Sequence, residues 1–463
     1  MNNVFGKFSH IHFVGIGGIG MSGIAEVLHG MTFKVTGSDI AESSNVLRLR
    51  ELGIDVKIGH KEENIAGADV IVYTSAAKSD NPELVAAKAQ RIPVIKRGEM
   101  LSELMRLKYA VAVAGSHGKT TTTSMVAEII KAAKLDPTIL IGGRLNSTNN
   151  NASCGLSNIM VAEADESDRS FLMLYPTIAI ITNIDFEHME SYKDFDDVKD
   201  SFTKFANMVP FYGCSVLCID NNNVADIIPN VSKRFITYGT KAQADVRAIN
   251  VKKDGFSVAY DLLKEGEILG HIKINLPGDH IVLNSLAAIA VSLEMDIDFN
   301  IIEKTLNDFS GVQRRMSMRY VSELNKVVDD YGHHPTEIST TLKAIRESSP
   351  NSRIIVVFQP HRYSRTQNLM NDFAKCFMDA DRLFITDIYA ASEAPIEGIN
   401  AETLVNEVSK HGFKDVVYLP VLDEFYKVID EEYEKDSIFI TFGAGSITNF
   451  SYEIAKYIEN KNK

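Results

Sequence analysis

The stretch Ala114–Thr121 constrains the fold of this chain more than any other part of its sequence. It reads Ala-Gly-Ser-His-Gly-Lys-Thr-Thr, and it lies between an apolar run at 109–113 and apolar residues at helical spacing over 124–131. A strand, a glycine turn and a helix in this order predict a phosphate-binding loop. The glycines let backbone N–H groups point at one centre, and the helix dipole adds positive potential there.

In such a loop, Lys119 reaches the outer phosphates of a nucleotide and the Thr120 hydroxyl holds a magnesium ion. The general pattern has a glycine five residues before Gly118, where this chain has Val113, so the loop is a shortened variant that begins at Gly115. A chance Gly-Lys-Thr at a helix start is the alternative. The expected nucleotide contacts are Gly115, Ser116, His117, Gly118, Lys119, Thr120 and Thr121.

A second glycine-rich turn, at 15–20, lies near the start of the chain. It follows an apolar run at 11–14 and precedes a helix-like stretch at 21–29. Gly15, Gly17 and Gly20 match the dinucleotide fingerprint, and Asp39 lies about 20 residues on, where a ribose-binding acid is expected. Alone, this pattern predicts NAD. A diphosphate at a helix N-terminus beside an acid describes any nucleotide diphosphate, however, and a purely structural turn is a further alternative.

Polar residues follow two buried strands of the middle segment. The apolar run 158–162 ends in the acidic stretch Glu163–Asp168, and the run 177–181 ends in Thr182–His188. Ligands of open parallel sheets bind beyond the carboxyl ends of the strands, and a carboxylate there is the expected magnesium partner of Thr120. A solvated acidic loop and a structural His188 are the alternatives.

A third alternating α/β pattern follows, with strands predicted at 353–358, 382–387 and 437–441 and a helix predicted after the stretch 326–335. His333, His334, His361, Arg362 and Arg365 lie at strand ends. The forked donors of arginine suit carboxylates and phosphates. Zinc is disfavoured because no companion ligands stand at metal spacing, and exposed strand ends are the other interpretation.

The sequence therefore predicts an α/β protein of three domains: a Rossmann-like domain at 1–108, a central P-loop-type ATPase sheet at 109–312 and a Rossmann-like domain at 313–463. Its length of 463 residues agrees with about three domains. No apolar run is long enough for a membrane span and the N-terminus lacks a signal-peptide core, so we expect a cytoplasmic protein without membrane insertion. The net charge of −13 argues against nucleic-acid binding, and the four cysteines do not suggest a disulfide framework.

Several motifs in fixed order, together spanning nearly the whole chain, resemble the Mur ligases of bacterial peptidoglycan synthesis, and most of all the alanine-adding members. These motifs are Gly15–Gly23, Gly115–Thr121, Glu163–Asp168, Thr182–Ile184 with His188, Asp329–Thr336 and Pro360–Arg365.

The resemblance implies an ATP-dependent ligase that joins L-alanine to the carboxylate of UDP-N-acetylmuramate through an acyl phosphate, with ATP and Mg²⁺ as cofactors. It implies a role in cell-wall biogenesis, and hence in cell shape and division. The first domain would bind the UDP-sugar without NAD, the second ATP, and the third the amino acid. The expected partners are these substrates, and the expected assembly is a monomer or homodimer.

The resemblance also implies roles for individual residues. Those implied for catalysis are Lys119, His188, His333, Arg362 and Arg365, and those for magnesium are Thr120, Glu163 and His188. Further ATP contacts would be His280, Asn284, Arg315 and Asp330. The UDP-sugar would contact Gly15, Gly17, Gly18, Gly20, Ser38 and Asp39, and the amino acid would contact Tyr331, His333, His361, Arg362 and Arg365.

The chain departs from the family pattern at three places. Ile281 stands where asparagine is usual, Met316 where an aromatic residue is usual, and the segment 146–151 differs from what we expect near the substrate. Three other functions remain open: a ligase that recycles whole peptides onto UDP-N-acetylmuramate, a dinucleotide-dependent oxidoreductase, and a non-catalytic UDP-sugar sensor.

Overall fold

The computed structural model describes residues 4–74, 76–142, 152–391 and 393–461. The chain forms two compact units, and each is described by itself. Unit 1 comprises residues 1–249, 261–270 and 283–306, and unit 2 comprises residues 250–260, 271–282 and 307–463. The segment 146–151, for which we noted a departure from the family pattern, lies outside the described residues.

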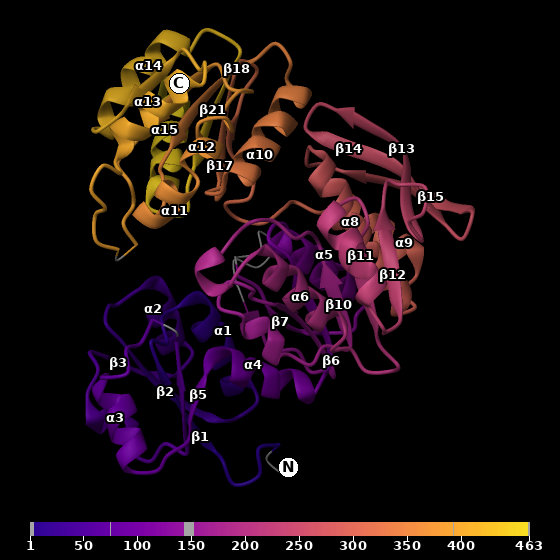
Figure 1. Cartoon of the computed structure of the whole chain (residues 1–463), viewed down its shortest axis with the longest axis vertical. Helices are drawn as coiled ribbons and strands as arrows, with labels where there is room; N and C mark the ends of the chain where they lie inside the picture. Colours follow the sequence, from indigo (N-terminus) through magenta and orange to yellow (C-terminus); the bar gives the residue numbers. More distant parts are fainter. Residues whose placement is uncertain (1–3, 75, 143–151, 392, 462–463) are drawn as a thin grey trace. The chain divides into compact units, whose positions relative to one another are not determined.

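The N-terminal part of unit 1 is a parallel sheet in the order β3-β2-β1-β4-β5. Figure 1 labels β1, β2, β3 and β5 of this sheet, together with helices α1 to α4. The order reverses between β1 and β4, which makes the carboxyl ends of these two strands the switch point where ligands bind in such sheets. The strands are β1 (His10–Val14), β2 (Lys34–Asp39), β3 (Asp55–Ile58), β4 (Val70–Tyr73) and β5 (Val94–Lys96). The helices are α1 (Ile19–Gly30), α2 (Ser44–Glu51), η1 (Glu62–Ile65), α3 (Pro82–Ala89) and α4 (Arg97–Arg106).

Both faces of this sheet are buried, as a parallel sheet between helices requires. Because side chains alternate along a strand, Ile11 and Phe13 pack with Ile24 of α1, whereas Val14 packs on the other face with Leu84 of α3. The apolar runs of the sequence are thus strands covered on two sides.

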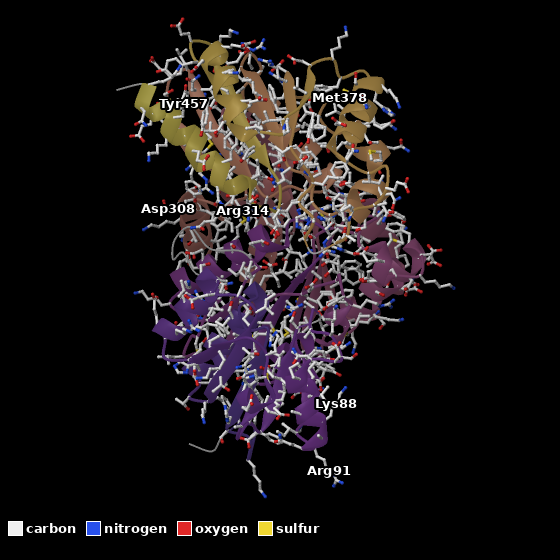
Figure 2. All side chains as sticks on the ribbon, turned by 90° about the vertical axis from the view of Figure 1, so that its left-hand side faces the viewer. Lys88, Arg91, Asp308, Arg314, Met378 and Tyr457 are labelled. Atoms are coloured by element: carbon white, nitrogen blue, oxygen red, sulfur yellow. The ribbon has the colours of Figure 1, made fainter. Side chains whose placement is uncertain are left out.

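At the carboxyl end of α3, Lys88 and Arg91 are exposed and point away from the ribbon (Figure 2).

The Asp69 carboxylate anchors the start of β1. One of its oxygens accepts hydrogen bonds from Ser9 N at 2.7 Å and His10 N at 2.8 Å. These backbone hydrogen bonds hold the pKa of Asp69 below its usual value. Because the folded-state pKa is the lower one, the stabilisation is complete above the unfolded pKa of about 4 and is lost as pH falls through the folded value.

We therefore expect Asp69→Asn to lower the free energy of opening of β1 by about 1 kcal/mol at pH 7, a hydrogen-bond contribution discounted for partial exposure. Native-state hydrogen exchange of the β1 amides measures this difference. It should shrink below pH 4. Asp55→Asn, which removes only the exposed ion pair with Lys57, is the control and should change little. A pH-independent difference would refute the role of the Asp69 charge.

The second sheet contains the strands β15-β14-β13-β12-β11-β10-β6-β9-β7-β8 in this order. Strand β6 is parallel to both of its neighbours, β10 and β9. The strands are β6 (Tyr109–Ala114), β7 (Thr138–Leu140), β8 (Ala152–Ser153), β9 (Ile159–Glu163), β10 (Ile178–Ile181), β11 (Cys214–Cys218), β12 (Phe235–Gly239), β13 (Val246–Asp254), β14 (Ser257–Lys264) and β15 (Glu267–Ile274). The helices are α5 (Lys119–Ala132), η2 (Ser170–Met173), η3 (Met189–Ser191), α6 (Phe195–Ala206), α7 (Asn222–Ile227), η4 (Ile228–Asn230), α8 (Asp279–Glu294) and α9 (Phe299–Asn307).

The third sheet has the order β16-β17-β21-β18-β19-β20, and its strands are parallel except for the antiparallel pair β16–β17. Its two faces bury different residues: Val328 and Ile440 on one, Val327 and Phe439 on the other. The strands are β16 (Ser317–Val321), β17 (Asn325–Asp330), β18 (Arg353–Phe358), β19 (Arg382–Ile385), β20 (Val416–Tyr418) and β21 (Ser437–Phe442). The helices are α10 (Pro335–Ser348), α11 (Tyr363–Asn368), α12 (Met370–Phe373), α13 (Ala401–Lys410), η5 (Leu422–Glu424), α14 (Phe425–Glu432) and α15 (Ile447–Lys461).

The predicted three-part α/β architecture is confirmed, and the predicted strands fall where the apolar runs are. Two details differ. The segment 215–274, read as strands alone, also contains α7, whose N-cap Asn221 accepts a hydrogen bond from Val224 N. Helix α8 begins at Asp279 and not at Asn284. The boundaries at 108 and 312 stay predictions. Among the described residues, no helix has the length and apolarity needed to span a membrane.

Candidate functional site

The loop between β6 and α5 has the backbone that a phosphate cradle requires. Gly115 has φ +135° and Gly118, the N-cap of α5, has φ +80°, in the region that favours glycine. A Cβ on Gly115 would lie 2.0 Å from Thr182 Oγ1, and one on Gly118 would lie 2.6 Å from Asn284 Oδ1. Both glycines are therefore needed. Asn284 of α8, for which the family resemblance implied an ATP contact, lies against this loop.

The end of β10 braces this loop. Thr182 Oγ1 donates to His117 O at 2.6 Å, and Asn183 Nδ2 donates to the same oxygen at 2.9 Å. Asn183 Oδ1 in turn accepts from His117 N at 2.8 Å, and Ser116 Oγ accepts from Asp185 N at 2.8 Å. The Thr-Asn-Ile motif thus fixes the path of the loop, in part by pairing with the Ser116 and His117 amides, and the amides at the start of α5 remain for an anion.

Lys119, the first residue of α5, folds back over the loop. Its Nζ donates to Gly115 O at 2.6 Å and to Glu166 Oε1 at 2.7 Å. Glu166 is 4% exposed, and its burial raises its pKa above that of a solvated carboxyl, although the Lys119 charge opposes the shift. Its second oxygen, Oε2, is buried without a hydrogen-bond partner among the described residues.

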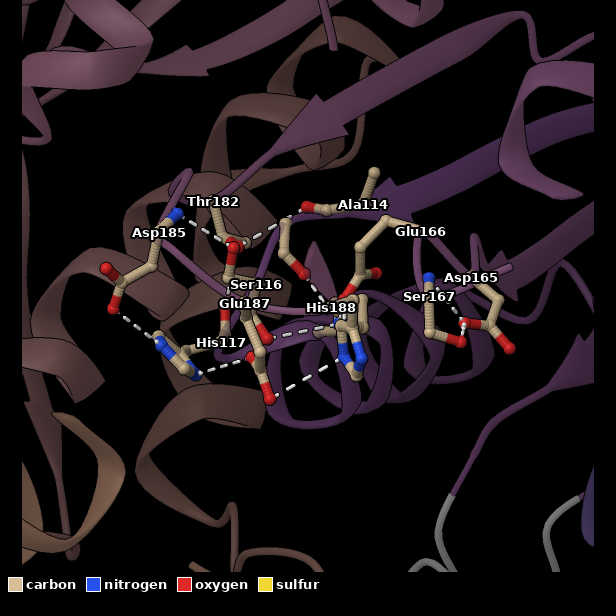
Figure 3. A network of polar contacts seen from close by, with 12 residues as sticks. Ala114, Ser116, His117, Asp165, Glu166, Ser167, Thr182, Asp185, Glu187 and His188 are labelled. Carbon is tan, nitrogen blue, oxygen red and sulfur yellow. Dashed lines mark hydrogen bonds and ion pairs between the residues drawn. The ribbon is translucent and has the colours of Figure 1, made fainter. Parts of the chain in front are cut away.

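A histidine and carboxylate network lies beside the loop (Figure 3). His188, whose backbone is left-handed at φ +57°, places Nε2 3.5 Å from Glu187 Oε1 and 3.7 Å from Glu166 Oε1. His117 Nε2 lies 3.0 Å from Asp185 Oδ2. Glu166 therefore links His188 to the loop, because the same carboxylate oxygen pairs with Lys119.

Glu163, the last residue of β9, faces the same region. Its Oε1 accepts from Gly142 N at 2.9 Å. Together with Lys119 it lines a cavity of about 410 Å³. Mg²⁺ prefers oxygen ligands. Side-chain oxygens that could ligate it in this part of the site belong to Thr120, Glu163 and Glu166.

The N-terminal glycine loop lies at the switch point of the first sheet. A Cβ on Gly15 would lie 2.6 Å from Thr74 Cγ2, beyond the end of β4. Gly17 N donates to Asp39 Oδ2 at 2.7 Å, so Asp39 holds the loop directly. The carbonyl of Ser38 accepts from Gly15 N at 2.8 Å, while its buried hydroxyl donates to Glu83 Oε2 at 2.6 Å. Gly18 is the N-cap of α1 and has no side chain to cap the helix.

The two phosphate loops meet in one place within unit 1. Gly18 and Gly20 of the first loop line the cavity of about 410 Å³ that also contains Lys119 and Glu163. The helix N-termini of α1 and α5 both belong to this site, and each favours an anion. This convergence was not predictable from two motifs separated by about 100 residues.

In unit 2, the predicted amino-acid contacts form a chain of rings at the strand ends. The ring centroids of Tyr331 and His333 are 5.2 Å apart, and those of His333 and His361 are 5.8 Å apart. Arg365 Nη1 lies 3.3 Å from His361 Nδ1. Burial, together with Arg365 and Arg362, lowers the pKa of His361 to about 4, so the imidazole is neutral at pH 7. Arg362 is the N-cap of α11, with φ +70°.

The predicted nucleotide contacts of unit 2 surround the end of β17. Asp330 accepts from Met316 N and Gly332 N, both at 2.7 Å, and burial raises its pKa to about 6 although Arg315 opposes the shift. Arg315 Nη1 donates to Glu337 Oε1 at 3.1 Å. Burial lowers the pKa of His280 to about 4, with Arg315 adding to the shift.

The two described departures from the family pattern are buried. Ile281 and Met316 are 5% and 7% exposed, and Met316 packs in the core of unit 2. Residues that the sequence prediction omitted also contribute. Glu166 belongs to the acidic motif, which indicated a carboxylate at the site. The motif did not indicate which of its carboxylates pairs with Lys119. Arg97 lines the cavity and had no signal, because a single arginine at a helix start is common.

Comparison with known proteins agrees with the architecture. The chain matches the family models of the Mur ligase family, catalytic domain, at residues 10–109, of the Mur ligase middle domain at 113–292, and of the Mur ligase, glutamate ligase domain, at 314–445.

Similar whole proteins exist. The chain is 53% identical over 444 residues to a UDP-N-acetylmuramate–L-alanine ligase from Geobacter sp. (strain M21), covering 96% of each chain. It is 52% identical to one from Trichlorobacter lovleyi, covering 96% of this chain and 98% of that one. A crystal structure of a UDP-N-acetylmuramate–alanine ligase from Thermotoga maritima matches with a TM-score of 0.81 and 30% identity, over 98% of this chain and 100% of that one. From these matches and the two glycine loops, we conclude that the chain belongs to the Mur ligase family.

Proposed function

We propose that this chain is a UDP-N-acetylmuramate–L-alanine ligase, an ATP-dependent enzyme that forms an amide bond in peptidoglycan precursor synthesis. The observation that supports it most is the single cavity lined by Gly18 and Gly20 of one phosphate loop and by Lys119 of the other. An enzyme that phosphorylates a group on a sugar nucleotide needs both anion sites at one place. Relatives with this name at about 50% identity support the same activity.

The proposed reaction has two steps. A muramoyl carboxylate oxygen attacks the γ-phosphorus of ATP, the bond to the β-phosphate oxygen breaks, and ADP leaves. The amine of L-alanine then attacks the acyl carbon, and the tetrahedral intermediate expels phosphate as the C–O bond breaks and the nitrogen loses a proton. Lys119 and the loop amides stabilise the charge on the phosphoryl group during transfer.

The residues of the site fit Mg²⁺. Glu163 and the Thr120 hydroxyl would hold it, and the unpartnered Glu166 oxygen and His188 lie in the same acidic region. When bound, the ion neutralises charge on the phosphate oxygens. Residues of the chain position the two loops. Thr182 and Asn183 fix the backbone of the loop that would bind the ATP phosphates, and Asp39 fixes the N-terminal glycine loop that would bind the diphosphate.

The aromatic chain of unit 2 suits a small amino acid. Arg362 and Arg365 provide forked donors for its carboxylate. His361 is neutral because of its lowered pKa and accepts a hydrogen bond from Arg365 at Nδ1, so its Nε2–H can donate to the carboxylate of the amino acid.

The rival functions are less well supported. For the oxidoreductase, Asp39 would have to bind a dinucleotide ribose. In the structure its carboxylate accepts a hydrogen bond from Gly17 N, a contact that any diphosphate-binding loop could use. A non-catalytic sensor would need no lysine poised over the second loop. A cytoplasmic location and a monomeric or homodimeric state are part of the proposal.

The test is phosphate release from ATP with UDP-N-acetylmuramate and a panel of amines. We expect release to require both the sugar nucleotide and an amino acid, with L-alanine faster than glycine or L-serine. The tripeptide L-alanyl-γ-D-glutamyl-meso-diaminopimelate should be a poor substrate. Faster turnover with the tripeptide would favour the peptide-recycling ligase, and NAD binding without any phosphate release would favour the oxidoreductase.

A further inference from the structure

Arg97 links the two phosphate loops of unit 1. It is the first residue of α4, its side chain is 22% exposed, and it lines the cavity shared by the loops. On one side, its Nη2 donates to Asp165 Oδ2 at 2.8 Å, and Asp168 Oδ2 lies 4.0 Å away. Its guanidinium therefore contacts the acidic segment that follows β9.

On its other side, Arg97 contacts the first turn of α1. A Cβ on Gly20 would lie 3.0 Å from Arg97 Nη1 and 3.3 Å from Arg97 Cδ. The side chain thus rests on the helix start that belongs to the N-terminal glycine loop. Glycine at position 20 leaves room for the guanidinium as well as for a close ligand.

The charges of the cavity show why a second cation is needed there. Among the described residues, Glu163, Asp165 and Asp168 line it, and the cations in this part of the lining are Lys119 and Arg97. Lys119 is held by its own loop and by Glu166, and under the proposed function it binds the ATP phosphates. A diphosphate at the start of α1 would face these carboxylates, and repulsion would weaken its binding unless a nearby cation compensated them.

We propose that Arg97 is a substrate-binding residue, which exchanges Asp165 for the diphosphate of the sugar nucleotide. This inference rests on the proposed function. Arginine suits the role because its planar fork binds two phosphate oxygens while it spans the gap between the loop and the acidic segment. In the free protein, Asp165 holds the guanidinium in place, and the arriving diphosphate replaces that carboxylate.

The test is calorimetric titration of the full chain with UDP-N-acetylmuramate in the absence of ATP. We expect Arg97→Ala to raise Kd by about 10- to 100-fold, the range for a charged hydrogen bond. Arg97→Lys keeps the charge without the fork and should lie between wild type and Arg97→Ala. Asp165→Asn removes the competitor and should bind as tightly as wild type or more tightly. Circular dichroism checks that each variant is folded, and Arg97→Lys decides the matter if Arg97→Ala fails to fold.

A purely structural ion pair gives a different pattern, because Arg97→Ala and Asp165→Asn would then weaken binding equally. That result, or unchanged Kd in Arg97→Ala, overturns the inference. Titration with UDP-N-acetylglucosamine, which has the diphosphate but no carboxylate, must show the same fold-loss. If Arg97→Ala weakened the binding of UDP-N-acetylmuramate alone, Arg97 would contact the carboxylate and not the diphosphate, which would contradict the proposal. Failure of the wild type to bind would instead refute the proposed function.

Discussion

Replacing Lys119 with alanine is expected to abolish the L-alanine-dependent release of ADP, with a loss in kcat of about 10³-fold or more. Lys119 Nζ donates to Gly115 O and to Glu166 Oε1, which keeps it at the loop where we propose that the γ-phosphate of ATP binds. The transition state spreads charge over the transferring phosphoryl oxygens, and this ammonium stabilises that charge. Binding of UDP-N-acetylmuramate should persist, because we propose that its diphosphate binds the N-terminal glycine loop.

The measurement is coupled ADP release at saturating substrates, together with titration of UDP-N-acetylmuramate. Loss of Lys119 leaves the buried Glu166 without its cation, so the thermal midpoint of the variant must be followed as well. Lys131→Ala is the matched control, since Lys131 lies in the last turn of the same helix and pairs only loosely with Glu128. Turnover retained in Lys119→Ala, with a folded protein, would refute the role of Lys119.

Glu163→Gln is expected to lower kcat by about 10²- to 10³-fold, which corresponds to the several kcal/mol that a bound metal ion contributes. Glutamine can still accept the hydrogen bond from Gly142 N, so the local structure is kept while the charge is lost. The half-saturating Mg²⁺ concentration should rise, because a neutral amide is a weaker ligand for a hard cation than a carboxylate.

Steady-state turnover as a function of Mg²⁺ concentration tests this expectation. Glu128→Gln, on the outer part of α5, removes a charge away from the cavity and should leave the Mg²⁺ dependence of wild type. An unchanged Mg²⁺ requirement in Glu163→Gln would contradict the assignment of Glu163 as a metal ligand.

Much of the fold follows from local sequence patterns. Apolar runs of about five residues ending in glycine, acidic or other polar residues marked β1, β6, β9 and β10, because a strand buried on both faces has no polar alternation. The glycine loops were predictable for the same local reason: Gly115 and Gly118 need backbone angles that other residues avoid. Helix α7 was missed because a helix of one to two turns has too few residues to show a period.

The site was only partly predictable, since its contacts join distant parts of the chain. Lys119 was predictable from its motif. Its partner Glu166 was not, because it is 47 positions away and stands beside other carboxylates in the sequence. Arg97 meets Asp165 across 68 positions, and no local pattern indicates such a pairing. The neutral state of His361 likewise depends on burial and on the positions of Arg362 and Arg365 in the folded unit.

Transfer of oxygen-18 from UDP-N-acetylmuramate to phosphate tests the central claim most directly, namely that both anion sites act on one carboxylate. The muramoyl carboxylate is labelled, and the phosphate released during turnover with ATP and L-alanine is analysed by mass spectrometry. The acyl-phosphate route predicts that each released phosphate contains one oxygen from the carboxylate. Unlabelled phosphate, released while the amide product forms, would contradict it.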